Sequence, residues 1–306
     1  MIKLYNDDCL KVLSEIETGS VDMLFADLPY GSTKCKWDVS IPLDQLWEEY
    51  NRICKINAAM VFTAAQPFTS VLVSSNIKNF KYTWVWEKSK ATGYLNAKKM
   101  PMRAHEDICV FYRKPPVYNP QMVPGDPYNK GKAHRPTAVY SQQGQKIRNA
   151  RRKELMGYDN ESLVSELITN GLPLDGTHEE LVESLVDLIK PLEVHVKNDT
   201  GLRYPRTVQY FKTAESEGKT THPTQKPVAL MDYFIKTYSN EGETILDNVM
   251  GTGATGVAAV RNGRSFIGVE LDKGYYDVAT QRILNEVAAQ NALSENTSLH
   301  LVKSMV

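Results

Sequence analysis

The chain has 306 residues, of which 42% are hydrophobic, so it is long enough to bury the core of one large or two ordinary domains. Its 36 Lys and Arg residues balance 36 Asp and Glu residues, and the formal net charge is zero. Taken over the whole chain, this balance gives no indication of a polyanionic partner, which a strongly basic domain would suggest.

The cysteines and the N-terminal segment indicate the class of protein. Cys9, Cys35, Cys54 and Cys109 include no CxxC pair, which favours reduced thiols over a disulfide framework or a metal site. The first ten residues carry two Asp where a signal peptide would need basic residues, and no apolar run approaches the roughly 18 residues of a membrane helix. The sequence therefore predicts a soluble cytoplasmic protein with no bound metal.

Apolar runs and helical spacing alternate through the first 113 residues. The patterns predict helices over 9–16 and 43–55 and strands over 20–28, 58–65, 81–88 and 106–113. Such alternation is typical of an α/β sheet. Trp84 and Trp86 fall within one of these strands, where we expect them to be core residues.

The composition changes after Pro115. Up to about Gly144 the chain is rich in Pro, Gly, Asn, Gln and Tyr, which predicts loop rather than sheet. Two amphipathic helices are predicted within 161–189, and Thr177 with Glu180 forms a capping box at the start of the second.

The α/β pattern resumes near Thr221. It predicts a helix over 227–239, a strand over 243–249, a loop and helix over 251–263, and a strand over 265–272. One domain therefore starts and finishes the chain and is interrupted by an insert. The resulting segments are 1–113, 114–204 and 205–306.

A glycine-rich loop lies between the first strand and the helix of this last segment. Gly251, Gly253 and Gly256 satisfy the pattern GxGxxG, and Glu270 ends the next strand, where an acid can accept hydrogen bonds from ribose hydroxyls. Only 36 residues follow Glu270, so the remaining strands must come from residues 1–113. The sequence therefore predicts a nucleoside-binding sheet whose strand order is circularly permuted.

A second loop, Asp27-Leu28-Pro29-Tyr30, ends a predicted buried strand, where α/β sheets place their ligand sites. The exocyclic amine of adenine or cytosine is a poor nucleophile because its lone pair is delocalised into the ring. Two acceptors that hold its two N–H groups can stabilise the positive charge that develops as the amine attacks a methyl sulfonium. Asp27 and the carbonyl of Leu28 can supply these acceptors, and Tyr30 offers a ring face for a flipped base.

These residues resemble the β group of amino-directed DNA methyltransferases, which methylate adenine N6 or cytosine N4. Asp27–Tyr30 is similar to the family's catalytic tetrapeptide, with Leu28 in place of its first proline. The resemblance implies a Rossmann-like methyltransferase fold, circularly permuted, with S-adenosylmethionine as cofactor and double-stranded DNA as partner. It also implies that 1–113 is the catalytic half, 114–204 the target-recognition insert and 205–306 the cofactor-binding half.

The cofactor residues are implied by the same resemblance. His222–Pro227 reads HPTQKP and matches a family motif, whereas Asp247–Gly253 departs from the usual Asp-Pro-Phe at Asn248 and Val249. The expected cofactor residues are Asp8 at the adenine, Glu270 at the ribose, Thr224 and Lys226 at the methionine carboxylate, and His222, Asp247, Asn248, Gly251 and Gly253 in the two motifs. Asn96 and His105-Glu106 resemble a further family motif, and we assign them no chemistry.

Three functions stay open at this point. Asp27 favours adenine N6, because the family mainly has Ser at this position for cytosine N4. Cytosine N4 methylation is the alternative, and cytosine C5 methylation is disfavoured because none of the cysteines follows a proline. A DNA-binding protein that has lost turnover is the rival from another class, and the altered Asn248-Val249 pair is its support.

The zero net charge conceals two opposed segments. Residues 81–153 contain 16 Lys or Arg and four acids, interleaved with aromatic residues, which is typical of a surface that binds phosphates and bases. The expected DNA-binding residues are Lys98, Lys99, Arg103, Lys130, Lys132, Arg135, Lys146, Arg148, Arg151 and Arg152.

The helical part of the insert, about 155–190, resembles a SAP module, a small helical DNA-binding motif. Asn170 and His178 stand where that family commonly has Lys or Arg, and residues 154–199 contain eleven acids and two lysines. DNA contact and a partner-docking or structural role are therefore alternatives for this module. The recognition sequence, the oligomeric state, including a homodimer, and a restriction, phage or regulatory context are left open.

Overall fold

The computed structural model describes residues 1–31, 39–133, 142–187, 194–198, 200–218, 220 and 224–303, with side chains left out for 128–148, 187–198 and 293–303. The chain forms two compact units, residues 1–121 with 204–306, and residues 122–203. Each unit is described by itself.

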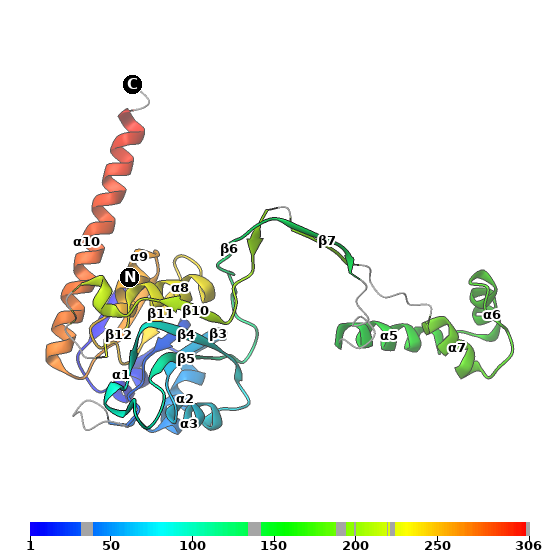
Figure 1. The fold of residues 1–306 in the computed structure, drawn as a ribbon, viewed down its shortest axis with the longest axis horizontal. Helices are drawn as coiled ribbons and strands as arrows, with labels where there is room; N and C mark the ends of the chain where they lie inside the picture. Colours follow the sequence, from blue (N-terminus) through cyan, green and yellow to red (C-terminus); the bar gives the residue numbers. More distant parts are fainter. Residues whose placement is uncertain are drawn as a thin grey trace. The chain divides into compact units, whose positions relative to one another are not determined.

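The first unit contains an eight-stranded sheet of order β1-β12-β11-β2-β3-β5-β4-β10 (Figure 1). Every neighbouring pair is parallel except the two made by β5, which therefore runs against all the others. The strands are β1 (Ile2–Tyr5), β2 (Val21–Ala26), β3 (Cys54–Ala64), β4 (Phe80–Thr92), β5 (Arg103–Phe111), β10 (Val208–Phe211), β11 (Thr244–Asp247) and β12 (Ser265–Val269). The expected α/β, circularly permuted fold is confirmed, since β11 and β12 lie beside strands from the start of the chain.

Helices cover both faces of this sheet. One face carries α1 (Cys9–Glu15), α2 (Leu43–Ile53) and α3 (Phe68–Ser75), and the other carries α8 (Val228–Tyr238), α9 (Ala254–Arg261) and the start of α10 (Lys273–Lys303) (Figure 1). Two short 3-10 helices, η1 (Tyr94–Asn96) and η2 (Ala214–Glu217), lie in connections. Alternate residues of β2 belong to opposite cores, Leu24 to the first and Phe25 to the second, which is why residues 23–26 are all apolar.

Trp84 and Trp86 are confirmed as core residues. Each is 3% exposed, and each indole N–H has an acceptor: Trp84 Nε1 donates to the Tyr238 hydroxyl at 2.8 Å, and Trp86 Nε1 donates to the Phe211 carbonyl at 3.0 Å. These bonds tie β4 to α8 and to the edge strand β10. They also satisfy two buried indole N–H groups, which would be costly to leave without an acceptor.

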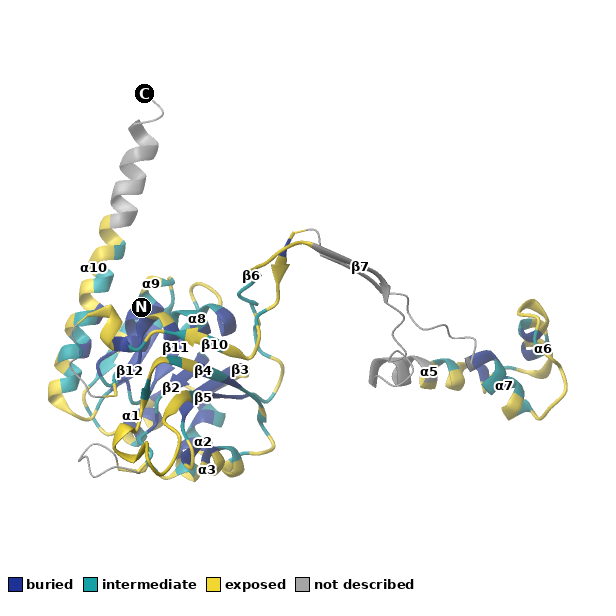
Figure 2. Cartoon of the chain, viewed as in Figure 1, coloured by how far each residue is buried: buried dark blue, intermediate teal, exposed yellow. Residues whose placement is uncertain are grey.

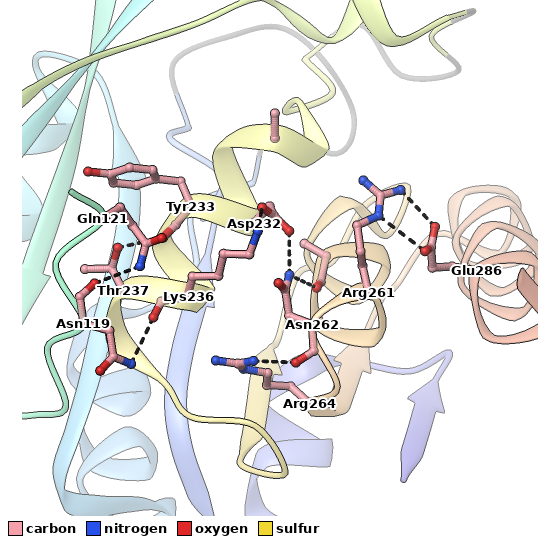
Figure 3. A network of polar contacts seen from close by, with 12 residues as sticks. Asn119, Gln121, Asp232, Tyr233, Lys236, Thr237, Arg261, Asn262, Arg264 and Glu286 are labelled. Carbon is pink, nitrogen blue, oxygen red and sulfur yellow. Dashed lines mark hydrogen bonds and ion pairs between the residues drawn. The ribbon is translucent and has the colours of Figure 1, made fainter. Parts of the chain in front are cut away.

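Polar contacts hold together the helical layer formed by α8, α9 and α10 (Figure 3). Asp232 of α8 accepts a hydrogen bond from Asn262, at the end of α9, at 2.6 Å, and Arg261 of α9 donates to Glu286 of α10 at 2.9 Å. Asn119, in the chain that leaves the first unit, donates to the carbonyl of Ser239 at 3.1 Å. Helices from different parts of the last segment therefore form one layer behind the sheet.

The second unit contains two short ribbons and a helical cluster. Its strands are β6 (Val123–Pro124), β7 (Tyr128–Ala133), β8 (Val194–Asn198) and β9 (Leu202–Arg203), and its helices are α5 (Gln142–Leu155), α6 (Asn160–Thr169) and α7 (His178–Asp187). The expectation of loop rather than sheet in 115–144 is wrong for β6 and β7, which pair antiparallel with β9 and β8. Both partners lie beyond the helices, so no local pattern could reveal them.

The helices of the second unit have their own apolar core. Leu155, Leu163, Leu167 and Val182 are buried in it. The capping box is confirmed: Thr177 N donates to Glu180 Oε2 at 2.7 Å, and Glu180 N donates to Thr177 Oγ1 at 3.3 Å.

Candidate active site

Four carboxylates lie where parallel strands end. Asp27 follows β2, Asp247 ends β11, Glu270 follows β12, and Asp8 comes after β1. These strands are neighbours and run in the same direction, so the four residues share the carboxyl edge of the sheet. The chain leaves β11 towards β12 on one side and leaves β2 towards β3 on the other. The space above β11 and β2 is therefore a topological switch point, where such sheets bind ligands.

Three donors hold the Asp27 carboxylate. Lys226 Nζ lies 2.6 Å from Oδ2, while Oδ1 accepts hydrogen bonds from the Tyr30 hydroxyl at 3.3 Å and from the Thr63 hydroxyl. Thr63 is fully buried in β3, the strand beside β2. A carboxylate offers about four lone-pair sites, so Asp27 is fixed in place and still has capacity to accept one further donor.

Lys226 belongs to a buried row of alternating charges. Its side chain is 9% exposed and lies 3.5 Å from Glu106 Oε2, and Glu106 Oε1 lies 3.1 Å from Lys88 Nζ. Burial raises the pKa of Glu106, but Lys226 and Lys88 together bring that pKa below its usual value. Burial lowers the pKa of Lys226, and Asp27 and Glu106 outweigh this effect and raise it. Glu106 and Lys226 are therefore held charged.

The loop after β2 is anchored in the core. Leu28 is 3% exposed, and the Tyr30 ring stacks on Phe68 with centroids 4.8 Å apart. One face of Tyr30 is thus covered by protein, and any base would have to use the other. Lys226, expected at the cofactor carboxylate, donates to Asp27 in this structure.

The three glycines of the GxGxxG pattern have different roles. Gly251 has φ +51°, and a Cβ there would meet nothing within 4 Å. Gly253 has φ +78°, and a Cβ would lie 3.0 Å from Ala279 of α10. At Gly256 a Cβ would lie 2.4 Å from Ile283 and 2.7 Å from Phe266. Gly251 therefore leaves open space at the site, whereas the other two let α9 and α10 pack closely.

We expect this difference in alanine variants. Gly253→Ala combines a left-handed backbone with a clash against α10, and should lower the free energy of unfolding by about 2–4 kcal/mol. Gly251→Ala lacks the clash and should cost about 1–2 kcal/mol. Thermal or urea unfolding of the two variants measures this, and equal losses would contradict the packing role of Gly253.

Asp247 is a buried acid with few charged partners. It is 3% exposed and accepts a hydrogen bond from the Val249 amide at 3.1 Å. Burial raises its pKa to about 7, only partly offset by its hydrogen bonds. Burial also raises the pKa of Glu270, although its oxygens accept from the Gly251 amide at 2.9 Å and the Asp272 amide at 2.8 Å.

This pKa makes stability depend on pH. The folded pKa of Asp247 lies above the unfolded value of about 3.9, so ionisation opposes folding as the pH rises from about 4 to 7. Asp247→Asn removes this penalty while keeping an acceptor for the Val249 amide. We expect its stability relative to the parent to increase from pH 5 to pH 8 by on the order of 2–4 kcal/mol, measured by urea unfolding. A difference independent of pH would contradict the assignment.

The other expected cofactor residues differ in burial and in hydrogen bonding. Asn248 is 1% exposed and accepts a hydrogen bond from the Tyr50 hydroxyl at 2.8 Å, and its Nδ2 has no hydrogen-bond partner among the described residues. Asp8 caps α1 by accepting from the amides of Leu10 and Lys11. Thr224 is exposed, and His222 lies outside the described residues.

The expected DNA-binding residues fall into three groups. Lys98, Lys99 and Arg103 are exposed at the β4–β5 connection. Arg151 pairs with Glu154 and Glu166, and Arg152 pairs with Glu179 and Glu183, so both are neutralised by acids of the second unit. The side chains of Lys130, Lys132, Arg135, Lys146 and Arg148 lie outside the described part of the chain.

Sequence reasoning assigned no role to Thr63, Lys88 and Glu106. Thr63 is one polar residue in an apolar run, and Glu106 was noted only as part of a motif-like stretch. The available signal was an isolated polar residue near the carboxyl end of a buried strand. Their meeting with Asp27 depends on strand pairing, which local patterns do not reveal.

Within the described residues, no group of three or more His, Cys, Asp or Glu side chains could hold a metal ion, and Cys9, Cys54 and Cys109 are buried free thiols. No helix in the described part of the chain is long and apolar enough to cross a membrane.

The chain was compared with known protein families and proteins. Residues 21–281 match the model of a family of DNA methylases, the N6/N4 methyltransferases. The type II methyltransferase M2.DpnII of Streptococcus pneumoniae is 47% identical over 62 residues, which are 20% of this chain and 23% of that protein. The chain thus spans about a fifth of the length of the curated relatives it matches.

Solved structures share the fold. The M1.HpyAVI–SAM complex superposes with a TM-score of 0.54 at 19% identity, covering 92% of this chain and 99% of that one. PvuII DNA methyltransferase, which is cytosine-N4-specific, gives a TM-score of 0.56 at 12% identity, covering 92% and 86%. Identities this low are evidence for a common fold and for nothing finer.

Proposed function

The chain belongs to the N6/N4 family of DNA methylases, and we propose that it transfers a methyl group from S-adenosylmethionine to N6 of adenine in duplex DNA. The observation that carries this proposal is the Asp27 carboxylate at the switch point of the sheet, beside the strand that leads into the glycine loop. Aspartate at the first position of the tetrapeptide supports adenine as the base.

The residues around the glycine loop fit this cofactor. Gly251 leaves open space for a close ligand, and each Glu270 oxygen accepts one amide hydrogen bond, so further lone pairs remain for ribose hydroxyls. Lys226 is a buried cation within reach of the same edge. When bound, S-adenosylmethionine would supply an electrophilic methyl group on a positively charged sulfur.

The chain's own residues would activate the amine. Asp27 Oδ accepts one amine N–H and the Leu28 carbonyl accepts the other, which favours a tetrahedral nitrogen and stabilises its growing positive charge. Thr63, Tyr30 and Lys226 hold the carboxylate in one orientation, so little reorganisation is needed. The free face of Tyr30 would support the flipped base.

The test is methyl transfer itself. DNA without modified bases is incubated with the protein and labelled S-adenosylmethionine, then digested to nucleosides and analysed by mass spectrometry. N6-methyladenine is the expected product, and sequencing of methylated positions gives the recognition site. Cofactor and DNA binding without any product would refute the proposal and support the rival without turnover.

Cytosine N4 methylation is the second candidate. Its support is the matching family of DNA methylases, which covers N6 and N4 methyltransferases alike. The same nucleoside analysis separates the two, because N4-methylcytosine and N6-methyladenine differ in mass and retention. Duplex DNA is the proposed partner in both cases, and we propose the second unit, residues 122–203, as the main part of the target-recognition insert.

A further inference from the structure

The connection between β4 and β5, residues 93–102, exposes apolar side chains. Leu95 is 97% exposed, Tyr94 78%, Met100 58% and Met102 37%. Leu95 is the most exposed of the large hydrophobic residues in the described part of the chain. All residues from 92 to 105 are exposed (Figure 2). Four exposed apolar side chains within ten residues are typical of a surface that binds another molecule.

This connection forms a turn that is closed by backbone hydrogen bonds. Gly93 has φ +95°, and the Gly93 carbonyl accepts from the Asn96 amide at 3.0 Å. The Asn96 carbonyl accepts from the Lys99 and Met100 amides at 2.8 and 3.0 Å. The backbone hydrogen bonds thus hold Leu95 at the surface in a defined turn, although its side chain gains nothing from the core.

The connection starts at the same sheet edge as the active site. β4 runs parallel to β2, so its carboxyl end and that of β2 lie at one edge. Lys88 of β4 and Glu106 of β5 join this end to Asp27 through Lys226. The exposed turn therefore extends from strands that are linked to the catalytic carboxylate through Lys226.

The charges around the turn select the partner. Residues 89–105 contain four Lys or Arg and no Asp or Glu. Lys98, Lys99 and Arg103 are exposed and have no ion-pair partner among the described residues. An apolar tip within a purely cationic border fits a polyanion with an apolar interior, which is a stacked nucleic-acid duplex.

We propose that Leu95 is a wedge that enters the DNA stack when the target base is flipped, while Lys98, Lys99 and Arg103 bind the flanking phosphates. This inference rests on the proposed function, because a flipped base leaves a gap in the stack. Filling that gap with an apolar side chain offsets the lost stacking and keeps the base extrahelical. Leu95 is a positioning residue and takes no part in the transfer itself.

The experiment compares two duplexes that carry the mapped recognition site. In one the target base is paired, and in the other it lies opposite an abasic position, which removes most of the cost of flipping. Leu95→Ala should lower the single-turnover rate of methyl transfer about tenfold on the paired duplex and less than about twofold on the other. Fluorescence of 2-aminopurine at the target position should fall in parallel on the paired duplex.

Two further variants sharpen the comparison. Leu95→Met keeps an apolar side chain of similar size and should retain most of the rate. Ile77→Ala removes another exposed aliphatic side chain, 66% exposed, just before β4 at the opposite edge of the sheet, and should change nothing.

Two results would overturn the proposal that Leu95 is a wedge. One is an unchanged rate for Leu95→Ala on the paired duplex. The other is an equal loss of rate on both duplexes, which would indicate only weaker DNA binding. A parent protein that methylates no DNA would instead refute the proposed function, and the wedge with it. Unfolding of Leu95→Ala is not a concern, because the side chain is not part of the core.

Discussion

Asp27→Ala should reduce methyl transfer by at least about 10³-fold and leave the affinity for S-adenosylmethionine nearly unchanged. In the mechanism we propose, the carboxylate is the acceptor that stabilises the positive charge on the amine, so its loss affects the transfer step. Gly251 and Glu270, which we propose for cofactor binding, follow β11 and β12 and make no contact with Asp27 among the hydrogen bonds described above. Lys226, which we also propose for the cofactor, does contact Asp27. Single-turnover transfer and equilibrium cofactor binding measure the two effects separately.

Two control variants make this result interpretable. Asp27→Asn keeps the shape and an acceptor oxygen but loses the charge, and should be nearly as inactive. Asp22→Asn changes an acid at the other end of β2, where Asp22 pairs with Lys55 at 2.5 Å, and should keep its activity. Full activity of Asp27→Ala would refute the proposed role of this carboxylate.

Lys226→Met should produce the largest loss of stability. Lys226 is the cation shared by Asp27 and Glu106, and its removal leaves Glu106 with Lys88 and leaves Asp27 with neutral donors only. Breaking a buried ion pair by removing one partner costs about 3–5 kcal/mol, because a buried charge is left uncompensated. Urea unfolding at pH 8 measures this loss.

The loss should depend on pH. Without Lys226, only Lys88 is left to offset the effect of burial, so the folded-state pKa of Glu106 rises and ionising this carboxyl opposes folding. The difference from the parent is then full at pH 8 and narrows as the pH falls towards the unfolded values of about 4. Adding Glu106→Gln to Lys226→Met removes one buried charge and should recover part of the stability at pH 8.

The outcome also bears on the expected cofactor role of Lys226. If Lys226 contacts the methionine carboxylate, S-adenosylmethionine should bind the Lys226→Met/Glu106→Gln variant with a higher Kd than it binds the parent. An unchanged Kd would limit Lys226 to holding Asp27. A single variant as stable as the parent at pH 8 would contradict the buried charge row itself.

Local sequence patterns determined much of this protein. The apolar runs predicted β2, β3, β11 and β12, because strands buried on both faces must be largely apolar. Aromatic and β-branched residues predicted the central parts of β4 and β5, which are less buried. The glycine loop and Asp27–Tyr30 were identified because they follow such strands directly. The Thr177–Glu180 capping box was predicted because its contacts span three residues.

Tertiary structure alone decided the contacts between distant segments. Asp27 and Lys226 are 199 residues apart in the sequence, and β7 pairs with β8 across the whole helical cluster. Strand pairing and burial bring such groups together, and no local spacing encodes either. The zero net charge shows the same division: the sequence separated a basic from an acidic segment, but folding decided which charges are paired. Arg151 and Arg152 are neutralised within the acidic helices, whereas Lys98, Lys99 and Arg103 are exposed at the β4–β5 connection, at the carboxyl edge of the sheet where we propose the active site.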